Sequence, residues 1–149
     1  MSDAARFPPV AELVPHESPM LLVDELLEWS PETALVRATI RAGSPFVHQG
    51  RMPASVLLEH MAQAIAVANG MADRTAGRPP AEIGVLLGTR ELELHGDSLA
   101  IGEVIELRVV REYSDGTLAR YACTTERAGQ LLARATINVM LMSSEEMQP

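Results

Sequence analysis

Apolar and polar residues alternate along four stretches of the chain, at residues 33–41, 103–113, 118–126 and 131–141. A period of two places every second side chain on the same face, which is typical of a β-strand with one buried face. A Ser-Asp-Gly run at residues 114–116 supplies a tight turn between two of these stretches. The pattern predicts long strands that follow one another in an antiparallel meander.

Residues 53–73 show a different pattern, because their apolar residues lie on nearly all sides of a helical period. Pro53 suits the first position of a helix, and the Ala-Gly-Arg-Pro-Pro run at residues 76–80 is a clear break. We therefore expect one long helix at about residues 53–73 that is buried on most of its sides.

Shorter patterns fill the rest of the chain. Residues 20–29, 83–87 and 90–95 have the apolar content of further strands, and residues 7–16 predict a short helix or turn bracketed by prolines. Residues 143–149 form a polar tail.

These elements predict an α+β fold in which a strongly curved antiparallel sheet wraps around one long central helix. The chain has 149 residues, the usual length of one domain, so we expect residues 1–149 to fold as a single unit. Long strands leave unpaired edges, and pairing across a twofold axis would bury one of them. A homodimer is the expected assembly.

The composition and charge of the chain argue against a nucleic-acid-binding protein and against a membrane-spanning one. The formal net charge is −8 and all twelve basic residues are arginines without a visible cluster, which argues against nucleic-acid binding. No stretch approaches the roughly 18 apolar residues of a membrane span, and the first residues lack a signal-peptide pattern, so we expect a cytoplasmic protein. Cys123 is the only cysteine; we expect a small core residue.

Glu59 is the most informative residue, because it places a carboxylate in the middle of the expected buried helix. Burial favours the protonated form of a carboxyl group, and a carboxyl that exchanges its proton near neutral pH suits a general acid or base. His48 lies eleven residues earlier (59 − 48) on an expected loop. An imidazole and a carboxyl that converge on one pocket would indicate proton-transfer chemistry.

Three segments of the chain resemble the hotdog-fold 3-hydroxyacyl-[acyl-carrier-protein] dehydratases of bacterial fatty-acid and polyketide synthesis. Residues 13–24 (LVPHESPMLLVD) are similar to the N-terminal signature of that family. Residues 52–64 (MPASVLLEHMAQA) resemble the start of its central helix, and residues 99–107 resemble its turn into the long C-terminal strands. Residues 49–53 and 84–90 are similar to the ApeP-like subgroup of aryl polyene biosynthesis clusters.

The resemblance implies a catalytic pair of a loop histidine and a helix carboxylate, supplied by opposite subunits of a dimer. The carboxylate corresponds to Glu59. If this sequence is aligned with the family pattern at Pro53 and Glu59, the catalytic histidine corresponds to His48. If it is aligned at Gln49-Gly50, Arg51 takes that place, and an arginine cannot act as a base at neutral pH.

The implied reaction removes water from a 3-hydroxyacyl thioester carried on acyl-carrier protein, without a metal or an organic cofactor. His48 would take the α-proton and Glu59 would handle the hydroxyl group. Backbone N–H groups at Ala54 and Ser55 would face the thioester oxygen. Gln63, one turn after Glu59, could hydrogen-bond the carboxylate or the substrate.

The remaining histidines have simpler interpretations. His16 is expected to cap a turn, and His60 is expected to be a packing or interface residue that would replace His48 as the base if His48 fails.

Two other functions stay open. One is a hotdog acyl-thioesterase, in which Glu59 would activate water. The other is a catalytically degenerate subunit that forms a heteromer with an active dehydratase.

Overall fold

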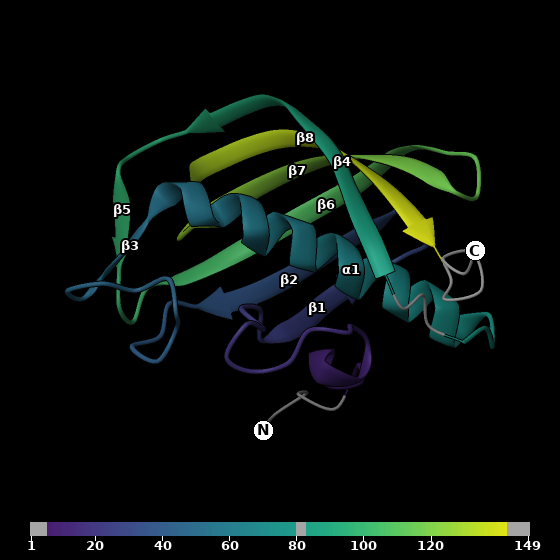
Figure 1. The fold of residues 1–149 in the computed structure, drawn as a ribbon, viewed down its shortest axis with the longest axis horizontal. Coiled ribbons are helices and arrows are strands. Elements are labelled where there is room, and N and C mark those ends of the chain that lie inside the picture. Colours follow the sequence, from purple (N-terminus) through teal and green to yellow (C-terminus); the bar gives the residue numbers. More distant parts are fainter. Residues whose placement is uncertain (1–5, 80–82, 143–149) are drawn as a thin grey trace, which may run out of the picture.

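The computed structural model describes residues 6–79 and 83–142, and Figure 1 shows the long helix lying across a strongly curved sheet. The six strands of this sheet pair antiparallel in the order β1-β2-β6-β7-β8-β4. The elements are β1 (Glu25–Trp29), β2 (Thr33–Thr39), α1 (Leu57–Thr75), β4 (Ile83–Leu94), β6 (Val104–Ser114), β7 (Leu118–Arg127) and β8 (Gln130–Met142). The predicted hotdog fold is confirmed.

The alternation of polar and apolar residues in the sequence matches the alternation of less buried and buried side chains along the strands. Along β2, every second residue is buried, as Ala34, Val36 and Ala38 are. The inward side chains of β6 are fully buried in the same way, and α1 packs mainly against β2, β6 and β7. The core therefore lies between one face of the sheet and one face of the helix.

The helix differs from the expected one in where it begins and ends. A 3₁₀ turn, Ala54–Val56, comes first, and α1 begins at Leu57 and ends at Thr75. The prediction that the helix is buried on most of its sides agrees with the structure, because none of residues 57–73 is exposed and the N-terminal segment covers part of what the sheet leaves open. The buried residues are Leu57, His60, Met61, Gln63, Ala64, Ile65, Val67 and Gly70.

Several irregular segments also differ from the expectation. The two strands expected at residues 83–87 and 90–95 are one strand, β4, with irregular pairing to β8 near Leu86 and near Arg90. A second, two-stranded sheet is formed by β3 (Arg51–Pro53), which begins at the end of the expected loop, and β5 (Ser98–Ala100). Such short strands have too few residues to show a period in the sequence.

The N-terminal part is mostly irregular. It holds a short 3₁₀ helix, Val10–Glu12, and the strand expected from residue 20 begins only at Glu25. The polar tail at residues 143–149 lies outside the described residues. Within residues 6–79 and 83–142, no helix combines the length and apolar character needed to span a membrane.

Gly70 marks a close approach between α1 and the N-terminal segment. A Cβ atom at this position would lie 1.9 Å from the carbonyl oxygen of Leu13. Only a residue without a side chain lets the backbone of Leu13 pack directly on the helix. The contact helps to place the segment that leads to residues 16–22, which belong to the candidate site.

Gly70→Ala should lower the free energy of unfolding by about 1–3 kcal/mol, because the added methyl group overpacks this contact. Without a clash, the same change in a helix would stabilise it by up to about 1 kcal/mol. Urea denaturation measures the difference. Thr75→Ala, at an exposed position in the last turn of α1, is the control and should have little effect. A stabilised Gly70→Ala variant would contradict the close contact.

Candidate active site

Glu59 lies in the first turn of α1, on the side of the helix that the sheet does not cover. Its side chain is 40% exposed, so the expected burial of this carboxylate is wrong for the single chain. Its Oε2 accepts a hydrogen bond from Nε2 of Gln63 at 3.0 Å. The result is a carboxylate that is oriented by the protein and accessible from outside the chain.

Gln63 connects this carboxylate to the N-terminal segment. It is fully buried, its Oε1 accepts the N–H of Leu22 at 2.7 Å, and its Nε2 donates to the carbonyl of Met20 at 2.8 Å. The same Nε2 also donates to Glu59. The amide group therefore holds the extended segment at residues 20–22 against the helix and orients Glu59 at the same time. The helical spacing predicts the contact with Glu59 but not the two bonds to the segment.

The structure brings His16, which was expected to cap a turn, close to Glu59. Nε2 of His16 lies 3.8 Å from Oε2 of Glu59, and the imidazole is about one-third exposed. Its Nδ1 is buried without a hydrogen-bond partner among the described residues. No spacing rule relates positions 16 and 59, so the only signal was that both lie in segments that carry the family resemblance.

His48 lies apart from this group. It is exposed on a two-residue turn, in which its N–H and carbonyl pair with the carbonyl and N–H of Arg51 at 2.8 and 3.1 Å. The turn residues Gln49 and Gly50 have positive φ angles of 53° and 80°. Across residues 6–79 and 83–142, no hydrogen bond or ion pair joins His48 to Glu59. The expected convergence does not occur within one chain.

Arg51 closes the same turn as His48, and its side chain is occupied by contacts with β5. Its Nε donates to the hydroxyl of Ser98 at 2.6 Å and its guanidinium also reaches the Ser98 carbonyl at 3.2 Å. The side chain therefore ties β3 to β5, and it is exposed on the outside of this small sheet.

The two backbone N–H groups expected to face the substrate, those of Ala54 and Ser55, lie in different surroundings. The N–H of Ala54 donates to the carbonyl of Asp97 at 2.9 Å, so it is not free to bind a substrate oxygen within this chain. Ala54 is also buried, whereas Ser55 is exposed. The donor role of Ser55 stays a prediction.

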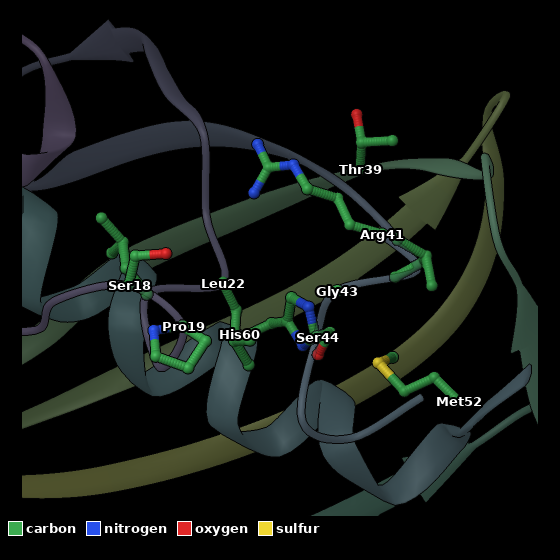
Figure 2. Close-up of a pocket in the computed structure, with 11 residues that line it drawn as sticks. Ser18, Pro19, Leu22, Thr39, Arg41, Gly43, Ser44, Met52 and His60 are labelled. Atoms are coloured by element: carbon green, nitrogen blue, oxygen red, sulfur yellow. The ribbon is translucent and has the colours of Figure 1, made fainter. Parts of the chain in front are cut away.

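His60 is buried as expected, but it also lines a pocket (Figure 2). Its Nδ1 lies 3.0 Å from the carbonyl oxygen of Val56. Burial lowers the pKa of His60, against smaller opposing contributions from the Val56 carbonyl and the charge of Glu59. The imidazole is therefore neutral at neutral pH.

The described residues give little support for a cysteine nucleophile or a metal site. Cys123 is a buried core residue, and burial raises the pKa of its thiol to about 12, which suppresses the reactive thiolate. Among residues 6–79 and 83–142, no group of three His, Cys, Asp or Glu residues could hold a metal ion.

Comparison with known families identifies the class of protein. The model of a family described as ApeP dehydratase matches residues 8–148. The chain belongs to this ApeP-like family of dehydratases. The family suggested by the sequence motifs, and the prediction of a dehydratase, are thereby confirmed.

Relatives of this ApeP-like protein agree with that assignment. A 3-hydroxyacyl-[acyl-carrier-protein] dehydratase FabZ of Sinorhizobium medicae is 29% identical over 143 residues, covering 92% of this chain and 90% of the relative. The FabZ of Bordetella pertussis is 28% identical over 145 residues, with 92% and 95% covered.

Solved structures show the same fold. A chain of the dehydratase heterocomplex ApeI:P from Xenorhabdus doucetiae matches with a TM-score of 0.91 and 25% identity, covering 95% of this chain and 96% of that one. A hypothetical thioesterase from Streptococcus pneumoniae matches with a TM-score of 0.60 and 12% identity over 80% of this chain and 85% of its own. At that identity the second match shows the fold alone.

Gln63→Leu should lower the free energy of unfolding by about 2–4 kcal/mol, because the buried N–H of Leu22 and carbonyl of Met20 lose their partner. The same variant should release residues 20–22 from the helix, which faster hydrogen exchange of the Leu22 amide would report. Gln130→Leu, at an exposed position in β8, makes the same change and should be nearly neutral. Unchanged protection of Leu22 would contradict the role given to Gln63.

Proposed function

We propose that this ApeP-like protein removes water from a 3-hydroxyacyl thioester carried on an acyl-carrier protein. The observation that carries the proposal is the carboxylate of Glu59, which is held by Gln63 and accessible at the start of the helix. The named activity of the FabZ relatives supports the substrate class. We also expect the protein to act in the cytoplasm, together with its acyl-carrier protein.

In this reaction a base takes the proton from Cα, the Cβ–oxygen bond breaks, and the hydroxyl group leaves as water with a proton from an acid. We assign the acid to Glu59 and the base to His48. The N–H of Ser55, at the positive end of the helix dipole, would stabilise negative charge on the thioester oxygen. Each proton transfer contributes about 10²–10⁴-fold to the rate.

We infer that the site is completed by a second subunit. His48 and Glu59 are both accessible but are not in contact within one chain, which is the arrangement expected if each meets its counterpart across an interface. A partner subunit that brings an imidazole to Glu59 would also cover the side of α1 that the sheet leaves open.

The surface for such a partner is the outer edge of β4. This strand ends the six-stranded sheet, so one side of its backbone has no neighbouring strand among the described residues. Leu87, Leu92 and Leu94 are 48%, 43% and 37% exposed along it. Pairing with an edge strand of a second subunit would use the free backbone groups and bury these leucines.

The partner is a second copy of the chain or a second dehydratase. The ApeI:P heterocomplex supports the heteromer, as does the position of His48 on an exposed hairpin away from Glu59. In that case a histidine of the other dehydratase would face Glu59, and the chain alone would be inactive.

Glu59→Gln should reduce dehydration of a 3-hydroxyacyl acyl-carrier protein by about 10²–10⁴-fold, because the amide cannot exchange the proton. Loss of water is followed by mass spectrometry, and release of free thiol in the same samples detects a thioesterase. His48→Ala should show a similar loss, whereas Arg51→Ala, on the same hairpin, should retain most of the activity.

Full activity in His48→Ala would contradict its assignment as the base. An inactive chain that gains activity when mixed with a second dehydratase, and loses it again in Glu59→Gln, would support the heteromer. Thiol release without dehydration would contradict the proposed reaction.

Leu92→Lys should shift the protein from dimer to monomer, because it places a charge on the apolar edge of β4. Native mass spectrometry and sedimentation measure the change, for the chain alone and mixed with a second dehydratase. Val104→Lys, 46% exposed at the start of the inner strand β6, is the matched control and should leave the assembly intact. Equal assembly of both variants would contradict the proposed interface.

A further inference from the structure

The pocket beside His60 lies on the sheet side of the helix start, between α1, the N-terminal segment and the loop that follows β2. Its volume is about 160 Å³. Leu22, Ile40 and Met52 supply apolar walls. Figure 2 shows the imidazole of His60 pointing away from the helix toward the loop that carries Gly43 and Ser44. Glu59 does not line this pocket.

His60 presents a hydrogen-bond acceptor to this pocket. Because a carbonyl oxygen can only accept, the contact with Val56 requires the hydrogen of the neutral ring on Nδ1. Nε2 is then left with a lone pair, and no hydrogen bond to it is present in the described part of the chain. The side chain as a whole is only 2% exposed. Nε2 is not among the buried polar atoms that lack a partner, so it is open to the pocket, and a donor that enters can bond to it in place of water.

The charges around the pocket are compensated. The guanidinium of Arg41, which lies at one wall, pairs with the carboxylate of Asp24. The other polar groups at the wall include the hydroxyls of Ser18 and Ser44. Nothing in this arrangement favours an anion or a cation over a neutral group.

We propose that the pocket binds an uncharged group with an apolar, ring-sized body and a hydroxyl that donates to Nε2 of His60. The size follows from the volume, since a cavity of about 150 Å³ holds a benzene molecule. The chemistry follows from the walls. Leu22, Ile40 and Met52 favour an apolar body, and Nε2 of His60 is an acceptor that favours a hydroxyl donor. The hydroxyls of Ser18 and Ser44 can donate or accept and do not require a charged ligand. His60 is the specificity-determining residue of this site.

Phenol and benzene test the proposal as a matched pair of probes, with the full-length protein and no substrate present. Calorimetry should give an affinity for phenol about tenfold higher than for benzene, the effect of one hydrogen bond. Phenol should also shift the ¹⁵N resonance of Nε2 of His60, and benzene should not.

His60→Phe keeps a ring in the pocket but removes the acceptor, so it should bind both probes equally. His95→Phe makes the same change at an exposed turn and should keep the preference for phenol.

Equal affinity of the wild type for both probes would overturn the proposal, because the acceptor would then play no part. Absence of binding at millimolar concentrations would overturn it as well, leaving a pocket that holds only water. The shift of the wild-type Nε2 resonance decides the question even if His60→Phe does not fold. None of these results depends on dehydration, so failure of the proposed reaction is detected separately.

Discussion

A single helix provides the apolar surface that one face of a six-stranded sheet needs to bury. The sheet curves around α1 and covers the side formed by residues such as Leu57, Met61 and Ala64. Every other feature of the candidate site follows from this packing, because it determines which side of the helix stays accessible. Glu59 lies on the uncovered side, and His60, about 100° further round the helix, is buried.

The two neighbouring residues therefore have opposite chemical surroundings. The carboxylate of Glu59 meets solvent, Gln63 and His16, and it is accessible to a substrate and to a second subunit. The imidazole of His60 is desolvated and neutral, and its only hydrogen bond among the described residues is to the helix backbone. Glu59 therefore suits proton transfer at an interface, and His60 suits recognition of an uncharged group in a pocket of the chain.

Gln63 and Gly70 show how an irregular segment is held without regular secondary structure. The buried amide of Gln63 satisfies the backbone at residues 20 and 22, as a neighbouring strand would. Gly70 lets the backbone of Leu13 approach the helix directly. Together they place the segment that carries His16 against the start of α1, so the N-terminal region becomes part of the candidate site.

The sequence by itself determined the fold class, the long strands and the single helix, because alternation and helical periodicity directly record which faces are buried. It also singled out Glu59, because a carboxylate among apolar helical residues stands out in any such pattern. It did not determine how much of α1 the sheet covers, and so it placed Glu59 in the interior. Nor did it predict the β3–β5 pair, which is too short to show a period.

Only the tertiary structure decided which histidine lies near Glu59. His16 and Glu59 are far apart along the chain, and their proximity results from the packing of an irregular segment on the helix. The same packing put His60 beside a pocket and left His48 on an exposed turn. Local patterns record the burial of neighbouring residues, but the meeting of distant segments depends on the sum of contacts over the whole fold.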